Sequence, residues 1–296
     1  GGFALMVEGV SLAAMIETPV VVVVSQRPGP ATGLPTRTEQ ADLEFVLYSG
    51  HGEFPRAIFA PASVESCFDL TRRAFELAEK YQGPVFILTD QFLADSDRSV
   101  EPFDVENLAP IRAGCDESEA AVPYRRFALT ENGISPRLLP GKTRHLVVVD
   151  SDEHTEDGHL TEDLAVRKLM VEKRMKKLEG LKGEALPPVF EGDSDPDILL
   201  VSWGSTSGAA AEAAKKLRLE GNRVSTLAFE QLWPLVPKQF IGHLESAGQV
   251  VAIEGNATGQ LANLIRRETG FEIGRRVLRY DGLPLTPEYI LREVSV

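Results

Sequence analysis

Two arginines in a stiffened loop are the residues of this sequence best suited to bind an anion. Only two polar residues separate Arg27 from a run of five valines, Val20–Val24. Arg37 lies ten positions after Arg27. The intervening stretch PGPATGLPT contains three prolines and two glycines, which stiffen the loop and let it turn tightly. A guanidinium on a rigid base suits a carboxylate or a phosphate. We therefore predict an anion pocket here; the alternative is a structural ion pair between Arg27 and Glu39 or another acid.

Two short glycine-bounded stretches could also offer backbone N–H groups to a phosphate. GSTSG (204–208) and GNATG (255–259) each lie between an expected strand and an expected helix. Neither matches the GxGxxG pattern or the P-loop. We interpret both as ordinary strand-to-helix turns.

The stretch DSDEHTEDGH (150–159) collects residues of metal-ligating types. It does not match the EF-hand, because its glycine is not at the sixth position and its twelfth position is Thr161 rather than glutamate. We expect a solvated acidic turn held by local hydrogen bonds.

His51, between two glycines, is expected to belong to a structural turn. The sequence displays no self-contained catalytic set, which favours a protein that shares its active site with another polypeptide.

The N-terminal third alternates between strands and helices, and this pattern positions the arginine loop. The valine run has no polar alternation, which predicts a strand buried on both faces in a parallel sheet. Ligands of such sheets bind at the carboxyl ends of the strands. The expected elements are a helix at 4–16, a strand at 20–25, a helix at 39–48, a strand at 55–61, a helix at 63–81 capped by Ser63 and Ser66, and a strand at 84–90.

The rest of the chain divides into an irregular stretch and a second α/β pattern. Between about residues 92 and 190 we expect an arm with one strand at 145–150 and a charged helix at 161–181, capped by Thr161. After Pro196, strands at 197–203, 223–229, 249–255 and 275–282 alternate with helices at 207–221, 236–248 and 258–270. The expected domains are 1–100, a linker at 101–194, and 195–296.

Composition limits the classes of partner. The net charge of −13 argues against nucleic acid or an anionic membrane as the main partner. Cys67 and Cys115 are far apart in the sequence, which indicates a reducing compartment, and we expect the cytoplasm. No apolar run approaches the ~20 residues of a membrane span. Because the chain opens on Gly1-Gly2 close to a helical pattern, we expect it to begin inside a domain.

Several long stretches resemble one enzyme family. GFALMVEGVSLAAMIETPVVVVVSQRPGPATGLPTRTEQADL, HGEFPRAIFAP and PVFILTDQFLADS resemble the alpha subunit of 2-oxoacid:ferredoxin oxidoreductases, the 2-oxoglutarate type in particular. ENGISPRLLPG, DSDEHTEDGHLTED and EGNATGQLANLIRRETG continue the resemblance, which covers essentially the whole chain in order. It implies an α/β fold with two doubly wound, mainly parallel-sheet domains. These are part of a pyrimidine-binding-type thiamine diphosphate domain and a domain like the transketolase C-terminal domain, joined by an irregular arm.

The resemblance also implies a reaction and its cofactors. Members of the family oxidatively decarboxylate a 2-oxoacid with thiamine diphosphate, make an acyl-CoA from coenzyme A and pass electrons to ferredoxin. The beta subunit is expected to hold the diphosphate, Mg²⁺ and a [4Fe-4S] cluster. No metal ligand or catalytic residue is expected in this chain, and the glutamate that engages the cofactor is expected upstream of Gly1.

By the same resemblance, four residues form the substrate site. Arg27 corresponds to the arginine that binds the 2-oxoacid carboxylate, and Thr36 to a threonine beside the substrate pocket. Arg37 and Gln40 belong to the same motif. Two arginines suit a dicarboxylate such as 2-oxoglutarate, although Arg37 could instead pair with Glu39 or Asp42. The alternatives are a subunit of an E1-type thiamine-dependent decarboxylase and a non-catalytic α/β module that binds an anionic metabolite.

Overall fold

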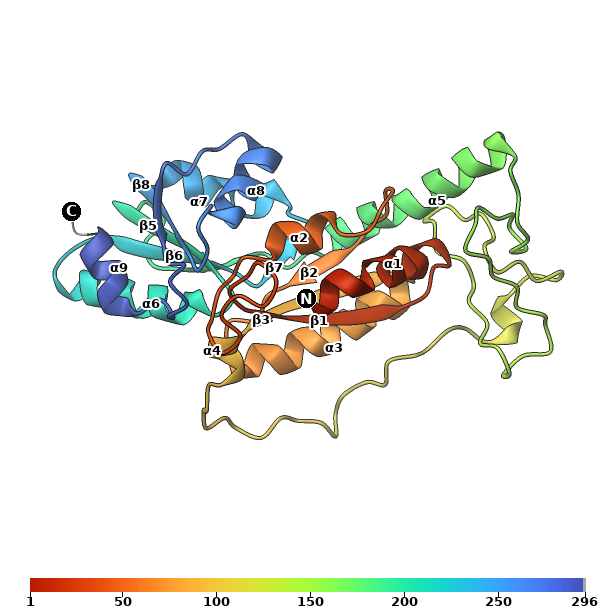
Figure 1. Ribbon diagram of the computed structural model, residues 1–296, viewed down its shortest axis with the longest axis horizontal. Coiled ribbons are helices and arrows are strands. Elements are labelled where there is room, and N and C mark those ends of the chain that lie inside the picture. Colours follow the sequence, from red (N-terminus) through yellow and green to blue (C-terminus); the bar gives the residue numbers. More distant parts are fainter. Residues whose placement is uncertain (295–296) are drawn as a thin grey trace.

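The computed structural model describes residues 1–294, which form two mainly parallel sheets with helices around them and a long irregular arm (Figure 1). This confirms the expected α/β class. The first sheet has the strand order β1-β3-β2-β7. Its strands are β1 (Val20–Gln26), β2 (Ala57–Phe59), β3 (Pro84–Asp90) and β7 (Gln231–Trp233). Its helices are α1 (Gly2–Met15), α2 (Leu43–Tyr48), α3 (Val64–Tyr81) and α4 (Gln91–Ala94).

Strand β1 pairs in parallel with β3 over its whole length, so Gln26 lies opposite Asp90 at the carboxyl edge. The prediction that β1 is buried on both faces is wrong within this chain. Val23 is 61% exposed, because β1 is the edge strand and only part of it is covered. The expected helix at 39–48 begins only at Leu43, since the residues before it are held in the contacts described below. The predicted Ser63 cap of α3 is confirmed, with Ser66 completing a capping box.

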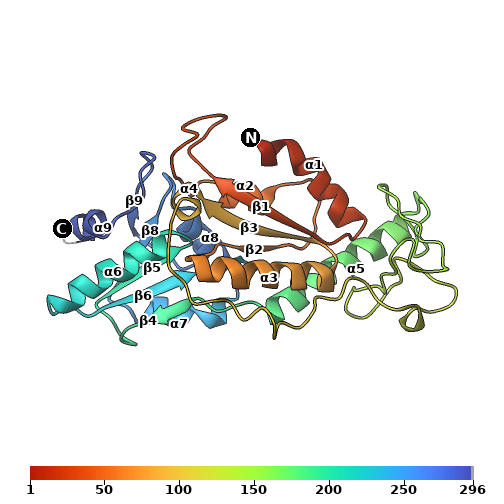
Figure 2. The ribbon, with the colours of Figure 1, turned by 90° about the horizontal axis from the view of Figure 1, so that it is seen from below.

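The second sheet has the order β4-β6-β5-β8-β9 and lies beside the first (Figure 2). Its strands are β4 (Val189–Glu191), β5 (Ile198–Trp203), β6 (Val224–Phe229), β8 (Gln249–Glu254) and β9 (Arg275–Leu278). Helices α6 (Thr206–Leu219), α7 (Ile241–Ser246), α8 (Gln260–Thr269) and α9 (Pro287–Val294) surround it. We call residues 198–294 the C-terminal region.

The helix predicted over 236–248 is interrupted. A 3-10 turn at Pro237–Gln239 precedes α7, and Phe240 between them has φ −143°. Phe240 is buried and packs edge-on against Phe229, so core packing outweighs helix continuity at this point. Strands β4 and β7, and helices α4 and α9, were not expected from the sequence. Among the described residues, no helix combines the length and the hydropathy needed to cross a bilayer.

The two sheets share a core. One cluster of buried side chains includes Phe86 of the first sheet together with Trp203 and Leu261 of the C-terminal region. Strand β7 belongs to the C-terminal region by sequence, but it pairs antiparallel with β2 and so is part of the first sheet. The predicted domain boundaries at residues 100 and 194 stay predictions.

The arm runs from α4 along α3 to the far end of the molecule and returns through α5 (Leu164–Gly183), as Figures 1 and 2 show. Besides α5 it contains a 3-10 turn at Glu117–Glu119. The strand predicted at 145–150 is wrong: this segment has no partner strand, and Leu146 is 80% exposed. The predicted Thr161 cap of α5 is also wrong, because the Asp163 carboxylate accepts the hydrogen bonds from Ala165 N and Val166 N.

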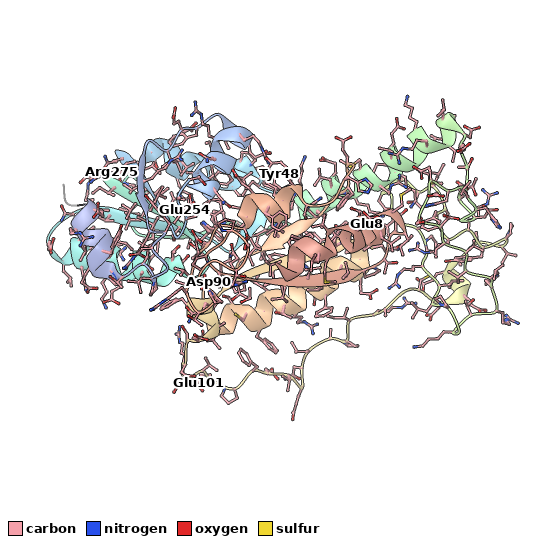
Figure 3. The ribbon with its side chains drawn as sticks, viewed as in Figure 1. Glu8, Tyr48, Asp90, Glu101, Glu254 and Arg275 are labelled. Atoms are coloured by element: carbon pink, nitrogen blue, oxygen red, sulfur yellow. The ribbon has the colours of Figure 1, made fainter. Side chains whose placement is uncertain are left out.

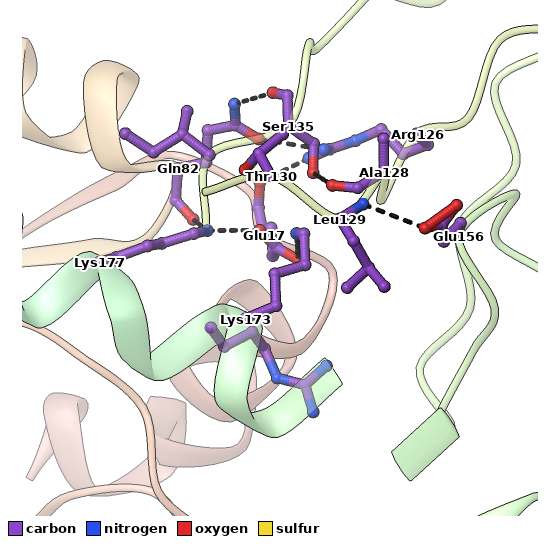
Figure 4. Close-up of polar contacts among 12 residues, drawn as sticks. Glu17, Gln82, Arg126, Ala128, Leu129, Thr130, Ser135, Glu156, Lys173 and Lys177 are labelled. Atoms are coloured by element: carbon purple, nitrogen blue, oxygen red, sulfur yellow. Dashed lines mark hydrogen bonds and ion pairs between the residues drawn. The ribbon is translucent and has the colours of Figure 1, made fainter. Parts of the chain in front are cut away.

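A buried group of charges fastens the arm to the first sheet; we call it the Glu17 cluster (Glu17, Arg126, Lys173 and Lys177; Figure 4). The Glu17 carboxylate accepts hydrogen bonds from the ammonium groups of Lys173 and Lys177. The Arg126 guanidinium donates to the Glu17 carbonyl at 2.6 Å. Burial raises the pKa of Glu17, but the two lysines outweigh burial and lower this pKa to about 2. Burial lowers the pKa of Lys173 to about 8.

Candidate active site

The arginine loop leaves the carboxyl end of β1, and Gln26 fixes its base. The Gln26 side chain is 1% exposed. Its amide nitrogen donates to Thr89 O on β3, and its amide oxygen accepts from Asp42 N. The start and the end of the loop are therefore held together at the edge of the sheet, as buried amides require partners for both their donors and their acceptor.

The first half of the loop is held by its own backbone. Leu34 N donates to Pro28 O at 3.1 Å and Arg37 N to Leu34 O at 3.2 Å. Gly33 has φ +50°, and a Cβ at this position would lie 1.9 Å from Pro28 O. Only glycine fits this close approach. These contacts give the loop the rigidity that its prolines predicted.

Arg27 lies in a pocket of about 480 Å³, which we call the Arg27 pocket. It is lined by Gly1–Ala4, Val23–Ser25, Arg27, Gly29–Ala31, Asp42 and Phe45. The Arg27 guanidinium donates one hydrogen bond, to Thr32 O. Among residues 1–294 it has no acidic partner within ion-pair distance, so the structural pair with Glu39 considered above does not form in this conformation. Its other N–H groups can meet an anion.

Two acids of the loop, Asp42 and Glu39, have raised pKa values. Burial raises the pKa of Asp42, and the nearby Arg27 guanidinium offsets this only in part. Burial also raises the pKa of Glu39, against a hydrogen bond from the Gly29 N–H.

Thr36 and Arg37 are both exposed on the outer part of the loop and do not line the Arg27 pocket. Within the described chain Arg37 forms no ion pair with Glu39 or Asp42. A Cβ built on Gly282 would lie 3.1 Å from the Arg37 Cβ, so the backbone of the C-terminal region closely approaches this part of the loop. The structure thus brings Arg27 into a pocket and leaves Arg37 at the surface beside it.

Gln40 lies between the two halves of the molecule and not in the Arg27 pocket. It is 2% exposed. Its side-chain amide donates to Trp203 O at 2.8 Å and accepts from Gly255 N at 3.0 Å, and its backbone N–H donates to Gly255 O at 2.6 Å. Asn256 Nδ2 donates to its carbonyl at 3.1 Å. A role of Gln40 in the site stays a prediction.

The turns at 204–208 and 255–259 use their polar groups in hydrogen bonds within the turns and to the first sheet and its loop. The Asn256 side-chain oxygen accepts from the N–H groups of Thr258 and Gly259. The Ser205 hydroxyl donates to the Asp90 carboxylate, and Glu254 accepts from Trp203 Nε1. Figure 3 labels Asp90, at the end of β3 in the first sheet, and Glu254, at the end of β8 in the second. These turns connect the two sheets, which the sequence patterns did not indicate.

The remaining candidates lie elsewhere. His51 is exposed, and its Nε2 lies 3.4 Å from Glu8 Oε2. It lines a different pocket from Arg27. The acidic turn 150–159 is less solvated than expected, because His154 is buried and Glu153 forms ion pairs with Arg167 and Arg174 on α5. Among residues 1–294, no three His, Cys, Asp or Glu side chains are grouped as a metal site.

Sequence reasoning missed Gln26, Asp42 and the aromatic residues Phe3 and Phe45 of the pocket. The signal for Gln26 was its place at the end of the valine run. No local pattern pointed to Phe3 or Phe45, since they come from helices that the sheet brings to the loop.

Comparison with known proteins shows which family this chain resembles in sequence and in structure. Residues 1–173 match the family described as "Pyruvate flavodoxin/ferredoxin oxidoreductase, thiamine diP-bdg". The chain is 38% identical over 290 residues to 2-oxoacid:ferredoxin oxidoreductase 1, subunit alpha, of Sulfurisphaera tokodaii, covering 96% of this chain and 45% of that protein. It is 30% identical over 294 residues to the 2-oxoglutarate synthase subunit KorA of Archaeoglobus fulgidus, covering 99% of this chain and 76% of that protein.

A solved structure agrees with these relatives. The 2-oxoglutarate:ferredoxin oxidoreductase from Magnetococcus marinus, with 2-oxoglutarate, coenzyme A and succinyl-CoA bound, superposes with a TM-score of 0.92 at 35% identity. The match covers 99% of this chain and 51% of that one. The chain thus spans about half the length of several of its relatives. It belongs to the 2-oxoacid:ferredoxin oxidoreductase family, as a homologue of the alpha subunits.

Proposed function

We propose that this chain serves in the oxidative decarboxylation of a 2-oxoacid to an acyl-CoA and CO₂, with electrons passed to ferredoxin. The observation that carries the proposal is the Arg27 guanidinium, which forms no ion pair within residues 1–294 and faces a pocket at the carboxyl edge of a parallel sheet. This edge is where α/β sheets bind their ligands. The family match over residues 1–173 supports the choice of reaction.

In this proposal Arg27 binds the carboxylate of the substrate. Two parallel N–H groups of a guanidinium match the two oxygens of a carboxylate. Because the carboxylate leaves as CO₂, this ion pair stabilises the bound substrate more than the transition state, so Arg27 contributes mainly binding and orientation. The apolar residues Val23, Phe3 and Phe45 line the same pocket and would exclude water from the reacting carbon.

The residues present fit part of a thiamine diphosphate site. The apolar side chains of the Arg27 pocket suit the flat aminopyrimidine ring, and Asp42 is a half-buried carboxyl group on its wall. When bound, the cofactor supplies the chemistry that breaks the bond between the carboxylate and the keto carbon. We propose that Mg²⁺, the diphosphate and an iron–sulfur cluster are held by a beta subunit.

Helix α1 supports a partner at this pocket. It is apolar on nearly all sides, which is typical of a helix buried all round. In this chain, however, Leu5 is 89% exposed and Met6 63% exposed. Val23 of β1 is exposed as well, and the N-terminal end of α1 lines the Arg27 pocket. A subunit that covers this apolar surface would also close the pocket.

For the substrate we propose 2-oxoglutarate. A second cation, the exposed Arg37 on the same loop, forms no ion pair within the described residues and suits the second carboxylate of a dicarboxylic oxoacid. The names of the relatives from Archaeoglobus fulgidus and Magnetococcus marinus include 2-oxoglutarate, which supports the same choice.

The test is an activity assay of the enzyme that contains this chain, purified with its partner subunit. We expect reduction of a viologen dye that requires coenzyme A and is fastest with 2-oxoglutarate, compared with pyruvate and a branched 2-oxoacid. Acyl transfer to lipoamide without dye reduction would instead identify an E1-type decarboxylase. Binding of an oxoacid in calorimetry, with no turnover and no partner on purification, would identify a non-catalytic module.

A further inference from the structure

The second half of the arginine loop is attached chiefly to the C-terminal region, although Thr38 Oγ1 also accepts a hydrogen bond from Phe92 N, just after β3, at 3.3 Å. Thr38 N donates to Gly282 O at 3.2 Å, and Gln40 makes the contacts with Trp203 and Gly255 described above. Gln260 Nε2 donates to Ala41 O at 2.8 Å. Residues 38–41 are therefore fixed by side chains and turns of the C-terminal region.

This attachment continues directly into the Arg27 pocket. Asp42, which follows the attached segment, lines the pocket and donates its N–H to Gln26 Oε1 at the base of the loop. Gln260 also accepts a hydrogen bond from Glu44 N at 3.1 Å, one residue before Phe45 on the pocket wall. A shift of Gln40 would thus move one wall of the pocket relative to Arg27, which is carried by β1.

All four polar groups of Gln40 are used in this junction. The side-chain oxygen, the side-chain nitrogen, the backbone N–H and the carbonyl each have a partner in the C-terminal region. The Gln40 side chain uses its oxygen and one of its two N–H donors in these contacts, and it does not line the Arg27 pocket. Such a residue determines the position of a segment.

We propose that Gln40 is a positioning residue: it holds the pocket wall against Arg27 by fastening the loop to Trp203 and Gly255 of the C-terminal region. The inference rests on the proposed function of Arg27. It assigns Gln40 a role through Arg27 instead of direct contact with the 2-oxoacid. A displacement of about 1 Å in a binding group is enough to change catalysis strongly.

The experiment measures KM and kcat for 2-oxoglutarate in the complete enzyme with Gln40→Met, which keeps the size of the side chain and removes both side-chain hydrogen bonds. We expect KM to rise about fivefold with kcat changed less than about twofold. The matched control is Gln231→Met, since Gln231 is also buried and bonds to Leu186 N and Pro234 O, away from the loop. It should lower the melting temperature comparably and leave KM unchanged.

A second variant tests the same idea from the other side of the loop. In Gly282→Ala the new Cβ would lie 3.1 Å from Arg37 Cβ and Leu34 Cδ1, so it displaces the loop without touching Gln40. Gly221→Ala is its control, because Gly221 has a similar φ of +92° and no atom within 4 Å of a Cβ. We expect KM to rise about threefold in the first variant only. This variant decides the matter if Gln40→Met does not fold, provided that KM is also measured with pyruvate, which has no second carboxylate for Arg37 to bind.

A double-mutant cycle with Arg27→Ala separates the roles. If Gln40 acts through Arg27, Gln40→Met adds no further rise in KM on the Arg27→Ala background. Full additivity would make Gln40 a substrate ligand, and a lower melting temperature with normal KM would make it structural only; either result overturns the inference. An unchanged KM in Arg27→Ala alone would remove Arg27 from its proposed role, whereas the proposed function itself fails only if the complete enzyme does not reduce the dye.

Discussion

Two cationic regions of this acidic chain are built in opposite ways. In the Glu17 cluster, Lys173 and Lys177 are almost completely buried and both bind the Glu17 carboxylate. In the Arg27 pocket, the guanidinium is partly exposed, donates to one carbonyl and has no acidic partner among the described residues. The Glu17 cluster joins the arm to the first sheet, whereas the Arg27 guanidinium faces a pocket.

The difference separates a structural use of charge from a binding use. A buried charge must be paired, because removal from water costs several kcal/mol per ion. A cation that a fold holds in a rigid loop without a partner has no such structural task, and it remains available for an anionic ligand. Substitutions in the Glu17 cluster should therefore change stability, and substitutions in the Arg27 pocket should change substrate affinity.

The largest expected effect follows from Glu17→Gln. This change leaves Lys173 and Lys177 buried without a counter-charge, so we expect the free energy of unfolding to fall by about 3–5 kcal/mol. Denaturant unfolding measures it. The control is Glu8→Gln, since Glu8 is exposed and its ion-pair partner among the described residues is the exposed His51; its effect should stay within about 0.5 kcal/mol. Equal effects of both changes would contradict the structural role of the cluster.

Acid should weaken the same cluster in a defined range. The pKa of Glu17 is about 2 in the folded chain, below its ordinary value of 4.5, so the unfolded chain binds the extra proton between these values. Stability from this group is complete above about pH 4.5 and is lost as the pH falls toward 2, by roughly 3 kcal/mol. The measurement compares unfolding of the wild type and Glu17→Gln across this range. The difference between them should shrink at low pH; a constant difference would rule out the lowered pKa.

At the Arg27 pocket we expect a change in affinity without a change in stability. Arg27→Ala should raise KM for the 2-oxoacid at least tenfold, or about 1.4 kcal/mol, with a smaller effect on kcat. Steady-state kinetics of the complete enzyme measure both constants. Arg144→Ala, at an exposed arginine of the arm, is the control and should leave KM unchanged. A lower melting temperature with normal KM would show that Arg27 stabilises the fold and does not bind the substrate.

The smallest effect is expected at Arg37. Because Arg37 is exposed, its attraction for a second carboxylate is screened, and Arg37→Ala should raise KM for 2-oxoglutarate about threefold. KM for pyruvate should not change, and the effect on 2-oxoglutarate should decrease at high salt. An equal rise for both substrates would show that Arg37 does not distinguish a dicarboxylate.

Local patterns predicted much of the fold. The valine run, the Ser63 cap and the 84–90 stretch correctly gave β1, α3 and β3, because their periodicity and end residues are local properties. The stretch 145–150 had the composition of a strand but no neighbouring strand to pair with. A β-strand depends on a partner that a local pattern does not reveal.

The site was predictable only in part, for the same reason. The place of Arg27 at the end of a strand could be read from the sequence. The attachment of Gln40 to Trp203 and Gly255, and the pairing of Glu17 with lysines more than 150 positions away, join segments that only the folded chain brings together. These long-range polar contacts leave no periodic signal in the sequence.

The most direct test of the central claim is a structure of the complete enzyme with its 2-oxoacid bound under conditions that prevent turnover. The account predicts that the Arg27 guanidinium lies about 2.7–3.2 Å from the oxygens of the substrate carboxylate. A carboxylate bound elsewhere, with Arg27 still donating only to Thr32 O, would contradict it.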